Sequence, residues 1–210
     1  METAKREPSE GNSAVRELIG KGAEAYIYKE GGYVIKVRES KGYRHPELDA
    51  KLRKTRTKKE ATALEKCRCA GIPCPEMKTY TESAIVMEYV EGKRLSEIFE
   101  ESGSGKKREY AGKCGVLLAE MHKIGLCHGD YALTNLVEHN GVIRPIDFGL
   151  CEFSTYYEKK AADLAVMYSS MKDEEAFNTF IEEYKARYSD SEEVVRRFEK
   201  NLTRGRYKKR

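Results

Sequence analysis

Two short polar stretches in the second half of the chain constrain its fold most strongly. Residues 128–135 (HGDYALTN) place Asp130 five positions before Asn135, and Asp147 opens the sequence DFG twelve positions after Asn135. A predicted strand ends at Asp147, and Gly149 permits a sharp turn behind it. Any one Asp in such a place is typical of a turn or a helix cap. The whole set, in this order, predicts phosphoryl transfer, with Asp130 receiving a hydroxyl proton and Asn135 and Asp147 holding Mg²⁺.

The first half of the chain has residues typical of phosphate binding. Residues 19–25 (IGKGAEA) predict a glycine-rich turn between two strands, whose amides would bind phosphate oxygens; a plain hairpin turn is the alternative. Lys36 lies in an apolar strand, where it either faces solvent or reaches the α and β phosphates of ATP. A carboxylate must orient such a lysine, and Glu60 on the following predicted helix is the candidate, with Glu65 as the alternative. We expect the nucleotide to contact the turn at Gly20, Gly22, Ala23, Glu24 and Ala25.

The order of the predicted elements favours an α+β fold with two lobes and a cleft between them. The first lobe is predicted to contain strands at 15–19, 25–28, 33–37 and 84–87, with one helix at 46–70 between the last two strands. The second lobe is mainly helical, with helices at 95–101, 108–124, 163–168, 174–188 and 192–202, and a hairpin of strands at 136–137 and 142–146. A flexible loop is predicted at 102–106. We expect a disordered N-terminus at 1–13, an N-lobe at 14–87, a reduced helical C-lobe at 88–203 and a basic tail at 204–210. The C-lobe begins with a linker at 88–92.

Composition favours a globular protein with no membrane partner. The chain is 35% charged and 40% hydrophobic, and it contains no apolar run long enough to span a bilayer and no N-terminal pattern of a signal peptide. Three of six cysteines, Cys67, Cys69 and Cys74, lie close together, but no second ligand group with zinc spacing follows. Reduced thiols, and hence a cytoplasmic or nuclear location, are the better interpretation.

Positive charge is concentrated in two segments, although the formal net charge is only +4. Residues 51–59 carry six Lys or Arg, which is typical of a solvated helix face. Residues 204–210 carry five, with almost no apolar residue that could pack. We expect this tail to engage an acidic or phosphate-bearing partner.

The motifs together resemble those of protein kinases over nearly the whole chain after Ser13. The resemblance implies ATP and Mg²⁺ as cofactors and an N-lobe sheet beside the helix that carries Glu60. It also implies a linker that binds adenine, with Met87 as gatekeeper and the backbone of Glu88 and Val90 as hydrogen-bonding groups.

Departures from the ordinary pattern narrow this resemblance. Gly129 stands where protein kinases have the arginine that holds a phosphorylated activation loop, so control by loop phosphorylation is not expected. No Ala-Pro-Glu motif follows, and only 61 residues remain after Gly149, too few for the usual peptide-binding subdomain. The His-Gly-Asp form is shared with RIO kinases and aminoglycoside phosphotransferases.

A more specific resemblance is to the small kinase-like subunit of the KEOPS complex. It is carried by residues 21–25 (KGAEA), 43–49 (YRHPELD), 52–53 (LR), 56–61 (RTKKEA) and 204–206 (RGR). It implies an ATPase that supports the threonylcarbamoyl-transferring subunit in making threonylcarbamoyladenosine on tRNA. It further implies partners among the other KEOPS subunits, with tRNA bound within the complex, and phosphorylation of itself and of proteins on Ser or Thr.

Three other functions compete with this one. An independent Ser/Thr protein kinase is disfavoured by Gly129 and by the short C-lobe. A catalytically dead scaffold has no need of the complete set Lys36, Glu60, Asp130, Asn135 and Asp147. A small-molecule phosphotransferase would have little room for a substrate pocket in so short a C-lobe.

Overall fold

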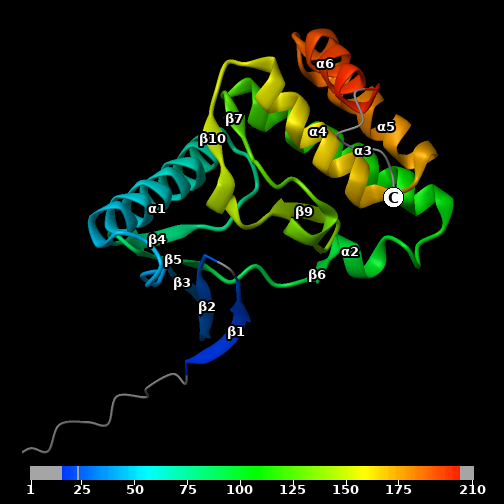
Figure 1. The fold of residues 1–210 in the computed structure, drawn as a ribbon. Helices are drawn as coiled ribbons and strands as arrows, with labels where there is room; N and C mark the ends of the chain where they lie inside the picture. Colours follow the sequence, from blue (N-terminus) through cyan, green and yellow to red (C-terminus); the bar gives the residue numbers. More distant parts are fainter. Residues whose placement is uncertain (1–15, 23, 204–210) are drawn as a thin grey trace, which may run out of the picture.

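A five-stranded antiparallel sheet and one long helix form the N-lobe (Figure 1). The strands lie in the order β1-β2-β3-β5-β4, with the bounds β1 Glu17–Lys21, β2 Tyr26–Glu30, β3 Tyr33–Val37, β4 Met77–Tyr80 and β5 Ala84–Glu88. Strand β3 is central, so Lys36 pairs with Ile27 of β2 and with Ile85 of β5. Helix α1 (Pro46–Cys69) begins at a proline, whose missing N–H costs nothing in a first turn. The sequence prediction of β3 and of α1 is confirmed.

The structure is a computed structural model that describes residues 16–22 and 24–203. The predicted N-terminus at 1–13, Ala23 of the glycine turn and the basic tail at 204–210 lie outside the described residues. Within them, every helix is too short or too polar to cross a membrane.

The C-lobe is a set of helices with two small sheets at the side facing the N-lobe (Figure 1). Its helices are α2 Leu95–Ile98, α3 Ser104–Lys123, α4 Tyr157–Met171, α5 Glu174–Arg187 and α6 Ser191–Thr203, with short 3-10 helices η1 Leu133–Asn135 and η2 Phe148–Leu150. Its strands are β6 Lys93–Arg94, β7 Leu126–Cys127, β8 Leu136–His139, β9 Val142–Pro145 and β10 Glu152–Phe153. The predicted Asn140-Gly141 turn of the β8–β9 hairpin is confirmed, because both residues have positive φ, 51° and 82°, as a type I′ turn requires.

Most of the apolar core belongs to the C-lobe. Of the buried apolar residues, nine lie before residue 89 and thirty-two after it. The predicted inner face of α3 is confirmed as buried, at Tyr110, Cys114, Leu117, Leu118 and Met121. Helix α5 packs closely on α3 because Gly115 has no side chain: a Cβ there would lie 2.3 Å from the carbonyl oxygen of Phe180.

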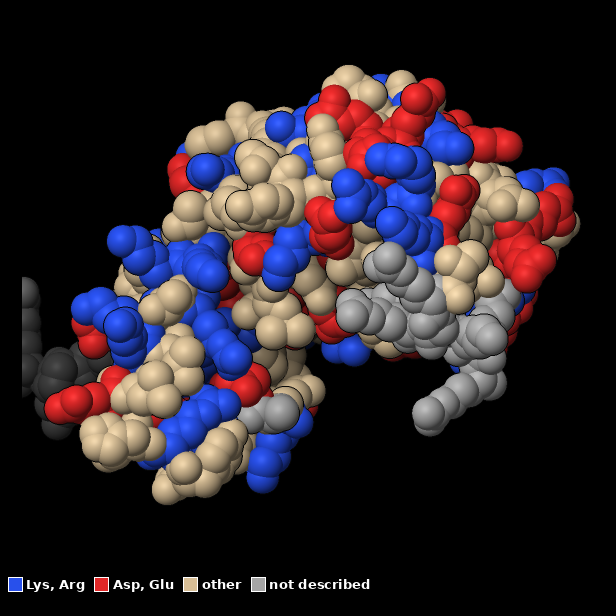
Figure 2. Space-filling view, turned by 45° about the horizontal axis from the view of Figure 1, so that its top comes forward, with Lys and Arg blue, Asp and Glu red and all other residues tan. Residues whose placement is uncertain are grey.

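The two lobes differ in charge. Described residues 16–88 hold sixteen Lys and Arg against eleven Asp and Glu, whereas residues 89–203 hold sixteen against twenty-one. Figure 2 shows Lys and Arg gathered over the N-lobe side of the molecule and many Asp and Glu over the helical side. The small net charge of the chain therefore conceals two lobes of opposite sign.

Two predictions about local structure were wrong, and strand β4 was missed. The predicted loop at 102–106 is helical from Ser104. Gly105 does not prevent this, because it lies in the first turn of α3, where the N–H groups have no partner within the helix in any case. Helix α4 begins at Tyr157 instead of residue 163. Strand β4 was not predicted, since its sequence MKTY is mostly polar, and it joins the sheet edge through backbone pairing with β5.

Candidate active site

A buried lysine of β3 connects the two lobes through ion pairs. Lys36 Nζ lies 2.8 Å from Glu60 Oε1 on α1 and 2.6 Å from Asp147 Oδ1 in the C-lobe. Burial works to lower the pKa of Lys36, but the two carboxylates outweigh it and the pKa is raised. Lys36 is therefore a fixed cation between the lobes, and Glu60, not Glu65, is its partner.

A second buried cation, Arg38, also pairs with Glu60. Its guanidinium contacts Glu60 Oε2 and donates to Thr57 Oγ1 at 3.2 Å, and all three groups are shielded from solvent. Residues two apart in a strand face the same side of the sheet, so Lys36 and Arg38 both point to α1. Glu60 is thereby held by two cations, one at each carboxylate oxygen.

The backbone at Asp147 turns sharply, and its side chain reaches into the cleft. Its φ is +61°, in the left-handed region, and its carboxylate accepts a hydrogen bond from the Gly149 amide at 3.2 Å. Partial burial works to raise the pKa of Asp147, but the Lys36 ammonium and the Gly149 amide lower it overall. The carboxylate is thus an anion placed beside Lys36, the lysine predicted to bind phosphate.

The segment that ends with η1 holds the predicted base and the predicted metal ligand together. Asn135 Nδ2 donates to Asp130 Oδ2 at 2.8 Å and to the Asp130 carbonyl at 2.9 Å. The Ile146 amide donates to the Asn135 carbonyl, which ties this loop to the segment that carries Asp147. The five-residue spacing therefore does bring the two side chains together.

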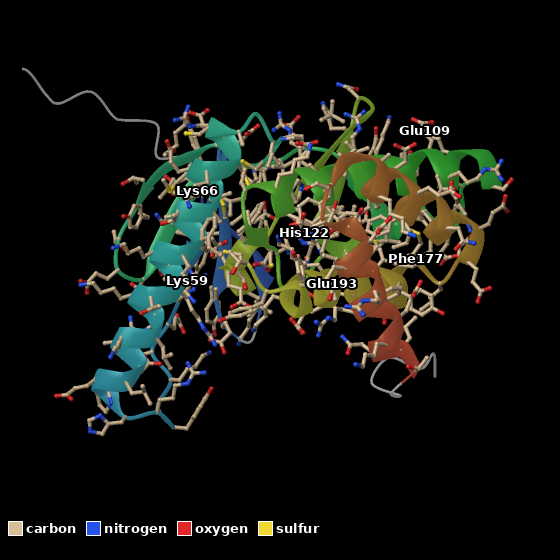
Figure 3. All side chains as sticks on the ribbon, turned by 90° about the horizontal axis from the view of Figure 1, so that it is seen from above. Lys59, Lys66, Glu109, His122, Phe177 and Glu193 are labelled. Carbon is tan, nitrogen blue, oxygen red and sulfur yellow. The ribbon has the colours of Figure 1, made fainter. Side chains whose placement is uncertain are left out.

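Asp163 on α4 fixes the backbone of this loop. The sequence analysis did not identify Asp163 as a site residue. Its two carboxylate oxygens each accept a hydrogen bond at 2.8 Å, from the backbone amides of His128 and Gly129. His122 of α3, in the middle of the C-lobe helices in Figure 3, lies 3.2 Å from the same carboxylate. The available signal was an acidic residue inside the apolar run AADLAV, which would be costly to bury without such partners.

Gly129 cannot carry a side chain in this fold. Its φ is +82°, and a Cβ there would lie 2.3 Å from the carbonyl oxygen of Leu150. The loop therefore passes directly against the segment behind Asp147. The glycine in His-Gly-Asp is a steric requirement of that close approach.

Two adjacent cavities, which share three lining residues, lie in the cleft between the lobes. One, of about 410 Å³, borders the linker; the other, of about 330 Å³, lies under the glycine turn. Lys36, Asp147 and Ile27 line both. The predicted site residues in the first are Lys36, Met87, Glu88, Val90, Asn135 and Asp147, and those in the second are Gly22, Glu24, Ala25, Lys36, Asp130 and Asp147.

Two predicted positions among the described residues do not line these cavities. Glu60 is buried behind Lys36, where it acts on the lysine, and Gly20 lies within β1. At the linker, the Glu88 amide already donates to the Glu76 carbonyl. A larger cavity of about 970 Å³ borders α3, α5 and the β8–β9 turn, and it contains none of the predicted site residues.

Similar proteins agree with this arrangement. An ADP-bound aminoglycoside phosphotransferase, APH(2'')-Ib, has the same fold, with a TM-score of 0.69 over 91% of this chain and 83% of that one, at 14% identity. The KEOPS complex subunit Bud32 of Pyrococcus abyssi is 34% identical over 92% of this chain and 97% of its own length. A probable bifunctional tRNA threonylcarbamoyladenosine biosynthesis protein of Methanocorpusculum labreanum is 36% identical, over 91% of this chain. The chain spans only 36% of that longer protein.

The two lobes, the cleft and the residues gathered in it define a protein-kinase-like protein of the atypical type with glycine before the loop aspartate. The RIO domain model matches residues 27–152, more than half of the chain. With the near end-to-end match to a Bud32 subunit, the chain belongs to the Bud32 family of RIO-domain proteins.

Proposed function

We propose that this chain binds ATP with Mg²⁺ in the cleft and transfers or hydrolyses the terminal phosphate. We further propose that it does so as the kinase-like subunit of a KEOPS-type complex that supports threonylcarbamoyladenosine formation on tRNA. The single observation that carries the proposal is Lys36 Nζ, held between Glu60 and Asp147 at 2.8 and 2.6 Å. A buried cation so oriented at the junction of two cavities suits the phosphates of a nucleotide.

The donor set of the cleft fits Mg²⁺. This ion prefers hard oxygen ligands and is usually held by one or two carboxylates together with substrate phosphates. Asp147 offers a carboxylate, and Asn135, whose Nδ2 is engaged with Asp130, keeps its amide oxygen as a ligand. Bound there, the ion would neutralise charge on the phosphates and orient them.

The roles of the remaining residues follow from their positions. Lys36 would contact the α and β phosphates, while the cavity beside Met87, Glu88 and Val90 would take the adenine. Asp130 lines the cavity under the glycine turn, so it is placed to accept the proton of an attacking hydroxyl or water. Asn135 would hold Asp130 in position for that transfer.

The names of the relatives support the assignment to tRNA modification. Bud32 of P. abyssi is named as a KEOPS subunit, and the M. labreanum protein as a threonylcarbamoyladenosine biosynthesis protein. We infer from this likeness that the threonylcarbamoyl-transferring subunit and other KEOPS subunits are partners, with tRNA bound within the complex. A cytoplasmic or nuclear location agrees with that role.

An independent Ser/Thr protein kinase is the second candidate, since Asp130 would serve a protein hydroxyl as well as water. To separate the two, ATP turnover is measured with the chain alone, and then with the transferase subunit and tRNA added. A KEOPS-type ATPase is expected to respond to these partners. Turnover that ignores them, together with efficient phosphorylation of added proteins, would favour the independent kinase.

Asp147→Ala provides the control for both functions. Removing the metal-binding carboxylate should abolish turnover, while the protein stays folded because the side chain is partly exposed at the cleft. Turnover and thermal unfolding are measured on the same preparation. Full ATPase activity in this variant, at an unchanged melting temperature, would contradict the proposed site.

A further inference from the structure

A pair of arginines holds the one acidic side chain of the glycine turn. Glu24 Oε1 lies 3.2 Å from Arg44, and Glu24 Oε2 contacts the guanidinium of Arg56 on α1. Arg44 is shared with Asp49, at 3.6 Å. Among the described residues, Glu24 is the one ion-pair partner of Arg56.

This contact lies inside the cleft. Glu24 and Arg56 both line the 330 Å³ cavity, together with Lys36, Asp130 and Asp147. Arg56 precedes Glu60 by four residues, so both lie on the same face of α1. The Glu24 carboxylate is therefore an anion beside the predicted position of the transferred phosphate.

The other cations of this cavity are already committed. Lys36 is bound by Glu60 and Asp147, and Arg38 by Glu60 and Thr57. The one partner of Arg56 in the described part of the chain is a carboxylate that is itself 41% exposed, and ion pairs of such exposure contribute little to stability. It is thus the cation of this cavity that a ligand can recruit most easily.

We propose that Arg56, assisted by Arg44, forms a binding site for the terminal phosphate of a nucleoside triphosphate, and that Glu24 occupies this site until the phosphate displaces it. This inference rests on the proposed nucleotide binding and extends it to the γ-phosphate. A guanidinium fork matches phosphate oxygens as well as it matches a carboxylate. A phosphate and the Glu24 carboxylate repel each other, so they compete for Arg56.

Competition distinguishes this site from a simple structural ion pair. Loss of either partner breaks a structural pair, so both variants would behave alike. In the proposed site the two variants act in opposite directions, and only on ligands that have a γ-phosphate. Comparing a triphosphate with a diphosphate therefore isolates the effect.

The experiment measures binding of the β,γ-imido analogue of ATP and of ADP, each with Mg²⁺, by titration calorimetry. Arg56→Gln should weaken binding of the analogue by about tenfold or more, the value of a charge-assisted hydrogen bond, and leave ADP binding unchanged. Glu24→Gln should strengthen binding of the analogue by roughly threefold or more, since a competing anion is lost. Arg56→Lys, which keeps the charge without the fork, should lie between wild type and Arg56→Gln.

Lys54→Gln is the matched control. It removes the same charge from the same helix by breaking the exposed pair with Glu82, and it should change neither affinity. Equal shifts of analogue and ADP binding in Arg56→Gln, or unchanged analogue binding in Glu24→Gln, would overturn the inference. If the wild-type chain binds neither nucleotide, the proposed function itself fails and the inference fails with it.

Discussion

The N-lobe and the C-lobe bring site residues to the same cleft by different means. In the N-lobe, Lys36 and Arg38 are almost completely buried, and both bind the buried Glu60, while only nine of the forty-one buried apolar residues belong to this lobe. In the C-lobe, Asp130 and Asn135 lie on a loop whose backbone is fixed by Asp163, and Asp163 rises from a dense apolar core. The N-lobe residues of the site are therefore positioned by ion pairs among themselves. The C-lobe residues are positioned by hydrogen bonds from their backbone to a helix of the core.

The difference predicts how each half responds to change. Removing one member of a buried ion network leaves the others charged and without a partner, which is costly. A side chain held through a backbone anchor is more independent, so it can be altered with little effect on its neighbours. Substitutions of site residues in the N-lobe should therefore lower the stability of the fold. Substitutions of site residues in the C-lobe should lower the rate of turnover and leave stability nearly unchanged.

Among the variants that compare the two lobes, Asp130→Asn, on the C-lobe side, should have the largest effect. Turnover should fall by roughly 10²–10⁴, the usual contribution of a general base, because the amide cannot accept the proton. Nucleotide affinity and unfolding temperature should stay close to wild type, since Asp163 still holds the loop. Loss of nucleotide binding in proportion to rate would show that the residue acts in binding, and the comparison of the lobes would break.

Glu60→Gln tests the N-lobe side. It leaves Lys36 and Arg38 buried beside a neutral amide, so the free energy of unfolding should fall by about 3–5 kcal/mol. Urea denaturation measures the loss. Glu65→Gln is the control on the same helix, where Glu65 makes an exposed pair with Arg68, and it should change stability little. Equal effects of the two variants would contradict the buried network.

Leu118→Ala asks whether the C-lobe depends on packing. The side chain is fully buried on α3, and its truncation leaves a cavity that should cost about 2–5 kcal/mol. Val142→Ala is the control, because Val142 is an exposed side chain of β9 and its truncation should leave no enclosed cavity. Added salt should leave the Leu118→Ala deficit unchanged; a deficit that varied with salt would indicate that charge stabilises this lobe too.

The smallest expected effect is that of pH. Burial lowers the pKa of His122 and of His128, against the opposing charge of Asp163. Both histidines are therefore neutral in the folded C-lobe at pH values where the unfolded chain, with a histidine pKa near 6.5, takes up protons. Stability should be constant above that pH and fall as pH drops below it, by at most about 1.4 kcal/mol per pH unit for each histidine.

Urea titrations at pH 7.5 and 6 check this expectation. His122→Gln should reduce the slope, whereas the exposed His139→Gln should leave it as in wild type. A stability that rose on acidification would mean that the buried histidines are charged in the folded protein.

The sequence predicted best those parts of the site that depend on local pattern. Strand β3 and helix α1 have recognisable periodicity and ends, and a lysine in the one needs a carboxylate on the other, so Lys36 and Glu60 were paired correctly. The spacing of Asp130 and Asn135 likewise belongs to a single loop. The roles of all these residues remain proposals.

Contacts between distant segments were out of reach. Arg38 was not singled out from the sequence, because only the docking of α1 on the sheet shows that the second carboxylate oxygen of Glu60 binds another cation. Asp163 is 33 residues from Asp130, and no spacing rule connects them. Glu24 was expected to contact the nucleotide, while its ion pair with Arg56 depends on how the turn folds over α1.

The contact between Gly129 and Leu150 also bears on how such a chain can change over generations. In an ordinary protein kinase, the arginine at the equivalent of Gly129 links the catalytic loop to a phosphorylated segment. Here any side chain at that position would clash with the carbonyl oxygen of Leu150. Because this oxygen belongs to the main chain, no substitution of Leu150 would remove the clash. A single Gly129→Arg substitution would therefore distort the catalytic loop and would not place it under control by phosphorylation. Acquiring that form of control would require rerouting the backbone first, which separates the two kinds of kinase-like protein by more than one mutational step.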